Sequence, residues 1–398
     1  MTDYSSKFKT IETNLVHAGT PKDRVEGAVV NPIYQSANYM MGDEEVYDAI
    51  RYIRLSNSPN HYVLAARISA IESTEAALVT ASGMAAISTT IMTFAKKGDH
   101  ILSQNTLYGG TQTFLTNDCP NMGISHTSFD PAQPDTWEKL RTPTTRAIYV
   151  ESISNPLIEV GDLKAVVEFA RKHKLVSIID NTFATPVNFR PAEIGFDIVV
   201  HSATKYLNGH SDIVGGVVAG SKEHVSKIRH LLIHLGGSMD PHTCFLLERG
   251  LKTLSLRVKE QNKNAMTLAK FLDSRSEVVA VNYCGLESNA NHKFARELFS
   301  GFGGMLSFYL DPKLDIALFI DSLTIPLHAA SLGGVETLVV RPTRSSHMGL
   351  TNEQREEKGI TENLLRVSVG VESIDELVED FTNALEKTAS KQPSQVVA

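Results

Sequence analysis

The chain has 398 residues, which is long enough for two or more packed units with a core of ordinary size. Its composition, 42% hydrophobic and 21% charged, is that of a globular protein. The net charge of −7 and the lack of a block of basic residues argue against a protein that binds nucleic acid.

The cellular setting is indicated by the first residues and by the cysteines. The start, Met1–Lys7, has no apolar signal core, and no apolar run approaches the ~18 residues that a membrane span needs. Cys119, Cys244 and Cys284 lie far apart and are odd in number, which argues against a disulfide framework and a CxxC metal site. We therefore expect a cytoplasmic enzyme with no membrane anchor and no metal.

Three parts are expected along the chain. Residues 1–60 are polar and irregular, with Pro32 and Pro59, and an arm of this kind rarely folds alone. Residues 61–255 carry regular strand and helix patterns, and residues 256–398 form a distinct last third. The predicted division is therefore an N-terminal arm, an α/β domain and a smaller C-terminal α+β domain.

The α/β domain opens with a candidate anion site. Apolar residues recur at helical spacing from Val63 to Ile71, and Ala76–Thr80 is predicted to be a strand. A small-residue turn, Ser82-Gly83-Met84, then opens an apolar helix that ends near Gly98. Backbone N–H groups at a helix start attract anions, and Gly83 lets a phosphate approach closely, although such a turn alone is a weak signal. Neither GxGxxG nor GxxxxGK[ST] occurs, so dinucleotide and nucleoside triphosphate binders lack their usual support.

Strands and helices then alternate, which predicts a mostly parallel sheet. The predicted strands cover 101–103, 148–150, 175–180 and 198–200, and helices are predicted from about 111 and over 163–174. One strand ends in Asp180, and the next leads into Ser202, Thr204 and Lys205. The carboxyl ends of parallel strands form the edge where α/β proteins bind ligands.

These polar groups suit an anionic cofactor that carries a carbonyl. Hydroxyl groups can bind a phosphate, a lysine amine can attack a carbonyl, and a carboxylate can pair with a protonated pyridine nitrogen. The ordinary alternatives are a cap role for Asp180 and a solvent-exposed Lys205.

The last third follows a helical stretch over 240–274. Residues 305–310 and 364–369 are predicted to be strands, and 374–385 a closing amphipathic helix. Arg366 lies on an otherwise apolar strand and needs an anionic partner, either a substrate carboxylate or a structural ion pair.

Two motifs together resemble a known signature. Asp180-Asn181-Thr182, followed by Ser202-Ala203-Thr204-Lys205-Tyr206-Leu207-Asn208-Gly209-His210, is similar to the signature of the Cys/Met-metabolism (transsulfuration) family of pyridoxal phosphate (PLP) enzymes. The resemblance extends from Val16-His17-Ala18-Gly19 to Leu365-Arg366-Val367-Ser368-Val369-Gly370. It implies PLP-dependent transferase fold type I (aspartate aminotransferase-like), with a mostly parallel central sheet and a smaller α+β C-terminal domain.

The resemblance also implies roles at the cofactor. Lys205 would be the covalent anchor of pyridoxal 5'-phosphate and then the base that carries protons between Cα and Cβ. Tyr108 would stack on the pyridine ring and assist, and Asp180 would keep the ring nitrogen protonated. The residues implied at the phosphate are Ser202, Thr204, Gly83 and Met84, with Tyr52 and Arg54 from a neighbouring subunit. A site shared in this way implies a homotetramer built as a dimer of dimers.

The implied substrate is a sulfur amino acid or a homoserine ester. The residues implied at its α-carboxylate are Arg366, Ser331 and Asn155. One departure from the family lies near the phosphate, where Asn57-Ser58-Pro59-Asn60 replaces the usual Asn-Pro-Thr with one extra residue. This departure puts the local geometry in question.

Three positions bear on the choice of family member. Gly110 stands where many methionine γ-lyases have cysteine, and Ala330 stands where cystathionine γ-lyases and γ-synthases often have glutamate. Arg341-Pro342-Thr343-Arg344 replaces a commoner His-Pro-Ala-Ser segment, and two arginines would suit an anionic substrate tail or face solvent. We place cystathionine γ-lyase-type elimination first. Cystathionine γ-synthase or O-acylhomoserine γ-replacement and methionine γ-lyase activity remain alternatives.

A non-enzyme explanation is a catalytically silent scaffold. Such a protein would be expected to lack Lys205, Asp180 or Arg366, and all three are present. A nicotinamide dehydrogenase lacks support because the glycine fingerprint is missing.

Overall fold

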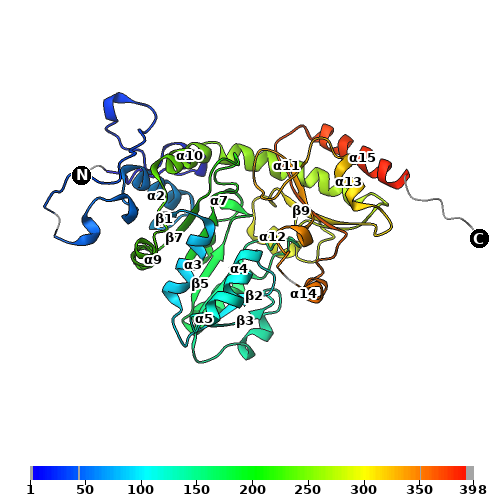
Figure 1. The fold of residues 1–398 in the computed structure, drawn as a ribbon, viewed down its shortest axis with the longest axis horizontal. Coiled ribbons are helices and arrows are strands. Elements are labelled where there is room, and N and C mark those ends of the chain that lie inside the picture. The colour runs from blue at the N-terminus through cyan, green and yellow to red at the C-terminus, as the bar shows by residue number, and fades with distance from the viewer. Residues whose placement is uncertain (1–2, 44, 350, 391–398) are drawn as a thin grey trace, which may run out of the picture. The chain divides into compact units, whose positions relative to one another are not determined.

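The structure is a computed structural model that describes residues 3–43, 45–349 and 351–390 (Figure 1). The chain packs as two units, the first made of residues 1–152 and 161–256 and the second of residues 153–160 and 257–398. The predicted boundaries after residues 60 and 255 stay a prediction. None of the described helices is long and apolar enough to cross a membrane.

The first unit is built on a seven-stranded sheet with the strand order β1-β7-β6-β5-β4-β2-β3. Neighbouring strands run parallel except at β7, which is antiparallel to both β1 and β6. The predicted mostly parallel sheet is therefore confirmed. The strands are β1 (Ala76–Thr80), β2 (His100–Gln104), β3 (Ser125–Phe129), β4 (Thr145–Glu151), β5 (Val176–Asp180), β6 (Ile198–Ser202) and β7 (Gly216–Gly220).

Helices connect these strands and cover the sheet. Those of the first unit are α1 (Ile11–His17), α2 (Pro59–Ile71), α3 (Gly83–Phe94), α4 (Gly109–Thr113), α5 (Cys119–Asn121), α6 (Leu163–His173), α7 (Thr185–Asn188), α8 (Pro191–Ile194), α9 (Lys222–Leu235) and α10 (Pro241–Leu251). Helix α11 (Leu254–Asp273) carries the chain into the second unit. The predicted helical stretch over 240–274 is thus two helices, α10 and α11.

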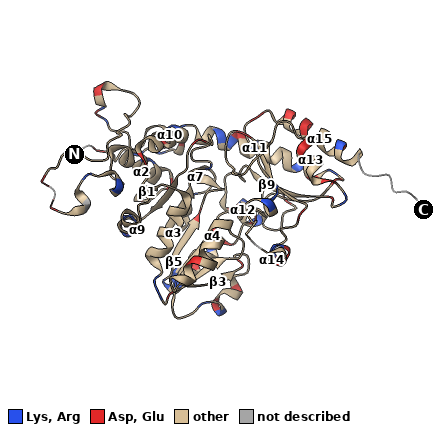
Figure 2. Ribbon diagram, viewed as in Figure 1, with Lys and Arg blue, Asp and Glu red and all other residues tan. Residues whose placement is uncertain are grey.

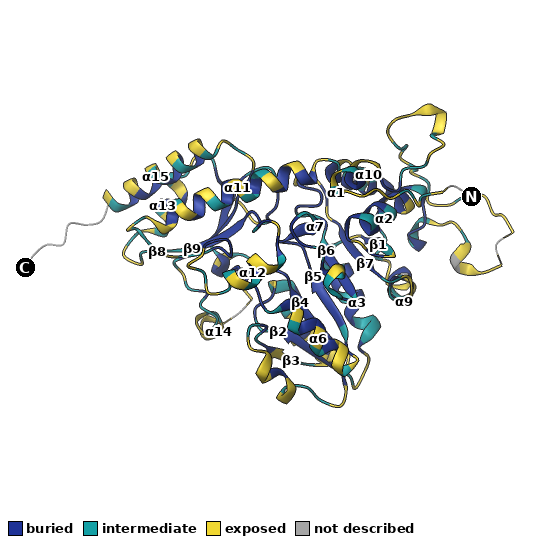
Figure 3. Cartoon of the chain, turned by 180° about the vertical axis from the view of Figure 1, so that it is seen from behind, coloured by how far each residue is buried: buried dark blue, intermediate teal, exposed yellow. Residues whose placement is uncertain are grey.

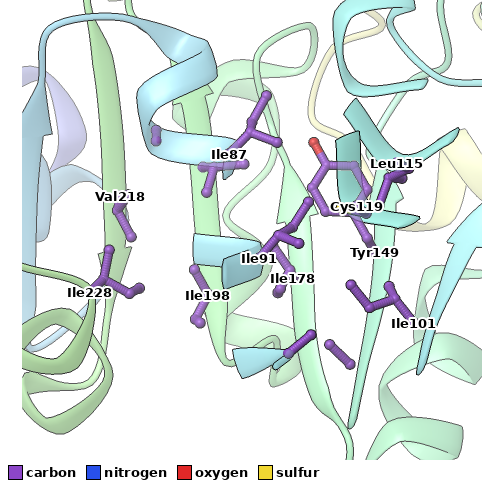
Figure 4. Packing of buried hydrophobic residues seen from close by; sticks show 14 of the residues in the cluster. Ile87, Ile91, Ile101, Leu115, Cys119, Tyr149, Ile178, Ile198, Val218 and Ile228 are labelled. Atoms are coloured by element: carbon purple, nitrogen blue, oxygen red, sulfur yellow. The ribbon is translucent and has the colours of Figure 1, made fainter. Parts of the chain in front are cut away.

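The core of the first unit lies between the sheet and helices α3 and α9. Ile87 and Ile91 of α3 face Ile178 of β5 and Ile198 of β6, and Ile228 of α9 extends the cluster (Figure 4). The central strands are buried, whereas the outer side of α6 is exposed (Figure 3). Because interiors pack at crystal-like density, this core fixes the ends of β5 and β6.

The second unit has a five-stranded sheet in the order β10-β11-β12-β9-β8. Strands β10 and β11 are parallel and the other neighbours are antiparallel. Its strands are β8 (Val278–Asn282), β9 (Met305–Leu310), β10 (Leu327–His328), β11 (Leu338–Val340) and β12 (Leu364–Ser368). Its other helices are α12 (His292–Leu298), α13 (Ile316–Ser322), α14 (Asn352–Glu357) and α15 (Ile374–Ser390). This mixed unit matches the smaller α+β domain implied by the resemblance.

A second core holds that sheet to its helices. Phe308 of β9 and Leu365 of β12 pack with Phe319 of α13 and Phe381 of α15. Helix α15 contains charged residues of both signs, whereas β9 contains none (Figure 2). Arg366 therefore lies on a central strand with an apolar neighbour on each side.

The apolar and glycine-rich run from Ile213 to Gly220 predicts one more strand, but β7 begins only at Gly216. The reason is a contact of Gly215 with the turn after β6. Its N–H donates to the Thr204 hydroxyl at 3.0 Å, and its carbonyl accepts from the Thr204 N–H at 3.3 Å. The backbone N–H and carbonyl of Gly215 therefore bond to Thr204 and not to a neighbouring strand.

Candidate active site

The start of α3 lies directly against the end of β6. Ser82 caps the helix, since its hydroxyl accepts from the Ala85 N–H at 3.0 Å. A Cβ placed on Gly83 would lie only 2.8 Å from the Cβ of Ser202. Glycine at this position is therefore what allows the helix start and the Ser202 side chain to lie side by side. The first-turn N–H groups of Gly83 and Met84 make this end of the helix suitable for an anion.

The turn after β6 brings the predicted hydroxyls and the lysine to the same edge. The Lys205 N–H donates to the Ser202 carbonyl at 3.2 Å, which closes the turn. The Thr204 hydroxyl is held by Gly215, as described above. The structure therefore brings Gly83, Ser202, Thr204 and Lys205 together at the carboxyl edge of the sheet.

Asp180 ends the neighbouring strand at this edge. Its Oδ1 accepts from the Thr182 N–H at 2.9 Å and from the Thr182 hydroxyl at 2.5 Å, and its Oδ2 accepts from the Tyr149 hydroxyl at 3.5 Å. Burial raises the pKa of Asp180 above its ordinary value, although the bonds from Thr182 oppose the shift. A cation placed against this buried carboxylate would relieve the cost of its charge.

Thr182 links the two strand ends and was not predicted as a site residue. Its hydroxyl donates to Asp180 and accepts from the Ser202 N–H at 2.9 Å. It thus fixes the carboxylate of β5 relative to the end of β6. The sequence signal was present, because Thr182 stands in the Asp-Asn-Thr motif, but the motif does not reveal which partner the hydroxyl contacts.

Tyr108 lies in the loop between β2 and α4 and is 42% exposed. A Cβ on Gly110 would lie 2.6 Å from Cε1 of Tyr108 and 3.1 Å from the sulfur of Met84. The ring therefore packs against the backbone at Gly110, close to the start of α3. An exposed aromatic face at this point could stack on a planar ligand.

Tyr52 and Arg54 lie in the arm, at a 3₁₀ turn. The Arg54 guanidinium donates to the carbonyl of Ile233 at 2.9 Å and to the Tyr47 hydroxyl at 2.6 Å, and it lies over the Tyr52 ring. Within one chain Arg54 is thus bound to the end of α9. Its binding to the cofactor phosphate of a neighbouring subunit stays a prediction.

The departure at residues 57–60 has a structural role. Asn57 closes the loop that carries Tyr52, accepting from the Tyr52 N–H at 2.9 Å and donating to the Ile50 carbonyl at 2.7 Å. Ser58 caps α2 together with His61 in a reciprocal capping box, and Pro59 occupies the first helical position. The altered segment therefore starts a helix and holds the Tyr52 loop.

The residues predicted at the substrate carboxylate lie together in the second unit. Arg366 is 4% exposed and donates to Oδ1 of Asn155 at 3.0 Å and to the Ser331 carbonyl at 3.1 Å. Asn155 joins this unit because residues 153–160 pack with it. Both of these acceptors are neutral oxygens, and the planar guanidinium group matches the two oxygens of a carboxylate ligand.

The residues of the first unit fit PLP in three separate ways. Gly83 lets the helix start lie directly against Ser202, so the first-turn N–H groups and the Ser202 hydroxyl lie side by side and suit a phosphate. The buried carboxylate of Asp180 lacks a cation among its described hydrogen-bond partners and suits a protonated pyridine nitrogen. Lys205 supplies an amine at the same edge. Among the described residues, no group of His, Cys, Asp and Glu could hold a metal ion.

Comparisons with known proteins agree with this fit. The profile of the family described as Cys/Met metabolism PLP-dependent enzyme matches residues 12–386. The chain is 39% identical over 376 residues to a cystathionine gamma-lyase of Bacillus subtilis, covering 94% of this chain and 99% of that protein. It is 39% identical over 396 residues to an L-methionine gamma-lyase of Pseudomonas putida, covering 97% and 99%. A crystal structure of cystathionine gamma-lyase from Lactobacillus plantarum complexed with L-serine is similar with a TM-score of 0.92 at 35% identity, covering 96% and 100%.

Proposed function

The chain belongs to the Cys/Met metabolism family of PLP-dependent enzymes, and on that premise we propose that it breaks a carbon–sulfur bond by a cystathionine γ-lyase-type elimination. The observation that carries the proposal is the meeting of the Gly83 turn, Asp180 and the turn that holds Lys205 at one sheet edge. When bound, PLP would supply an electron-accepting pyridine ring.

Each residue has a defined task in the proposal. Lys205 would anchor the cofactor and would carry protons between Cα and Cβ of the substrate, with Tyr108 assisting. The Asp180 carboxylate would accept a hydrogen bond from the protonated pyridine nitrogen and would balance its positive charge. The phosphate is bound by Gly83, Met84, Ser202 and Thr204, with Tyr52 and Arg54 from a neighbouring subunit. The substrate α-carboxylate is bound by Arg366, with Asn155 and Ser331 supporting the guanidinium.

Specificity within the family is tested by products. Ala330 and Arg344 are exposed, and Arg341 is half-buried. Both arginines follow the end of β11 at Val340. A positive group there would favour a substrate with a distal carboxylate, such as cystathionine or O-succinylhomoserine, over methionine, whose tail is a methyl thioether. Release of keto acid from L-cystathionine, L-methionine and O-succinyl-L-homoserine, each supplied alone, separates the candidates. Turnover of methionine alone would overturn the γ-lyase assignment.

We further infer a homotetramer that acts in the cytoplasm. The arm exposes large apolar side chains, with Met40 97% and Val29 84% exposed, and such patches mark interaction surfaces. All three cysteines are free thiols, as expected in a reducing compartment. Light scattering coupled to size exclusion checks the subunit number, and a monomer with full activity would contradict the shared site.

Gly83→Ala is expected to weaken cofactor binding. The new Cβ would lie 2.8 Å from that of Ser202, so the helix start and β6 must separate. Overpacking of this size corresponds to a rise in the dissociation constant of PLP of roughly 10- to 100-fold. The measurement is an absorbance titration of the apoprotein with PLP. Gly349→Ala is the matched control, because a Cβ there meets nothing within 4 Å. Equal affinity of both variants would contradict the proposed phosphate position.

Arg366→Lys is expected to raise KM for L-cystathionine roughly 10- to 100-fold with a smaller change in kcat. Lysine keeps the charge but loses the planar fork that contacts Asn155 and Ser331 while facing a carboxylate. Steady-state kinetics measures the effect. Arg296→Lys on the exposed side of α12 is the control. An unchanged KM in the Arg366 variant would remove this residue from substrate binding.

A further inference from the structure

We propose that Glu151 is a positioning residue for Tyr108, with Gly110 providing the seat of the ring. The inference rests on the proposed function, in which Tyr108 stacks on the cofactor and assists proton transfer. It concerns a buried carboxylate that none of the roles above uses.

The carboxylate of Glu151 contacts Tyr108 directly. Glu151 is the last residue of β4, is 5% exposed, and lies in register with Asp180 of β5. Its Oε1 accepts a hydrogen bond from the Tyr108 N–H at 2.6 Å. The bond is short and charge-assisted, and bonds of this kind are about twice as strong as neutral ones.

A carboxylate at this position is costly. It lies beside Asp180, and burial together with the charges of Asp180 and Glu151 holds the pKa of the Tyr149 hydroxyl well above its usual range. Two buried carboxylates so close raise each other's energy. The position nevertheless keeps an oxygen that accepts the Tyr108 N–H, and that acceptor oxygen is the feature the proposed role requires.

The loop that carries Tyr108 is tied to β4 at both ends. At its start, the side-chain oxygen of Gln104, the last residue of β2, accepts from the Glu151 N–H at 3.0 Å. At its other end, Tyr108 donates its N–H to the Glu151 side chain. Residues 105–108 are thereby clamped between the backbone and the side chain of a single strand-end residue.

The ring itself is seated by Gly110. A Cβ at this position would lie 2.6 Å from Cε1 and 3.2 Å from Cζ of Tyr108. The ring occupies the space that any larger residue at position 110 would take, and Tyr108 as a whole is still 42% exposed. Glu151 therefore fixes where the tyrosine is attached, and Gly110 fixes how its ring lies.

The test compares Glu151→Gln with Glu151→Ala in the PLP-loaded enzyme. Glutamine keeps an oxygen that accepts the Tyr108 N–H, so kcat is expected within about 3-fold of wild type. Alanine leaves that N–H unpaired and frees the loop, so kcat is expected to fall roughly 10- to 100-fold with KM little changed. The second readout is the visible circular dichroism of the bound cofactor, which reports the asymmetry of the groups that face it and is expected to weaken only in the alanine variant.

Two controls separate positioning from general stability. Asp162→Ala also removes a carboxylate that accepts a backbone N–H, here of Ala165 at 2.9 Å, but at the start of α6. It is expected to lower the melting temperature without changing the dichroism. In a Tyr108→Ala background, Glu151→Ala is expected to reduce kcat no further, because the ring that Glu151 positions is then absent.

Four results would overturn the inference. These are an alanine variant with normal kcat and dichroism, a glutamine variant as impaired as the alanine variant, an Asp162→Ala control with the same loss of dichroism, and additive losses in the double variant. If Glu151→Ala does not fold, Gly110→Ala replaces it and is expected to weaken the dichroism by displacing the ring. A wild-type protein that binds no PLP would instead refute the proposed function, so the two failures are distinguishable.

Discussion

Replacement of Lys205 by alanine is expected to reduce kcat/KM for the preferred substrate at least about 10⁴-fold. The lysine lies in the turn that follows β6, where its N–H is bonded to the Ser202 carbonyl. In the proposal it is both the covalent anchor and the base, so one substitution removes two functions. Neither neighbouring Ser202 nor Thr204 carries a group basic enough to replace it. Steady-state release of keto acid measures the loss.

The covalent role of Lys205 has its own readout. Borohydride treatment of the wild-type holoenzyme is expected to fix PLP to the peptide that contains Lys205, and the alanine variant is expected to bind PLP without fixing it. Lys270→Ala, an exposed residue on α11, is the control and is expected to behave as wild type. Fixation of the cofactor to another lysine in the wild-type enzyme would refute the anchor assignment.

Asp180→Asn is expected to reduce kcat roughly 10²- to 10³-fold, because the pyridine nitrogen loses the anion that keeps it protonated. The side-chain oxygen of asparagine can still accept both bonds from Thr182, so the local structure is retained. Asp180→Glu keeps the charge but lengthens the side chain, and it is expected to lose less activity than the asparagine variant.

Asp180→Asn is also expected to stabilise the apoprotein. Burial raises the pKa of Asp180, so its protonated form favours the folded state at acid pH, and this contribution is lost as the pH rises through the raised pKa. Asparagine is neutral throughout. The apo variant is therefore expected to melt above apo wild type at pH 8, and the difference should vanish below about pH 4. An apo variant that melts below wild type at pH 8 would show that Asp180 is stabilised by its surroundings rather than strained by them.

The fold and much of the cofactor site follow from local patterns. The β-branched run Ile198-Val199-Val200 predicts a buried strand, and the abrupt change to Ser202, Thr204 and Lys205 predicts a polar sheet edge. The Ser82-Gly83 turn can likewise be predicted, because a helix that starts in contact with a strand end requires a small residue at that point. These signals lie within a few residues of the feature that they predict.

Other features depend on contacts between distant residues and leave no local pattern. The bond between Glu151 and the Tyr108 N–H joins residues 43 positions apart. Asn155 packs with Arg366, which lies 211 positions away, so residues 153–160 join the second unit. Strand β3 was not predicted, because Ser125-His126-Thr127-Ser128 is polar and shows no apolar alternation. The strand lies at the edge of the sheet, where its residues are less buried than those of the central strands.

The most direct test of the proposed function is the product balance of the PLP-loaded enzyme acting on L-cystathionine. Cleavage at Cγ with uptake of one water predicts cysteine, 2-oxobutanoate and ammonia in equal amounts, with none formed by Lys205→Ala. Pyruvate and homocysteine would show cleavage at Cβ and contradict γ-elimination. A protein that binds PLP but releases no keto acid from L-cystathionine would contradict the assignment as well.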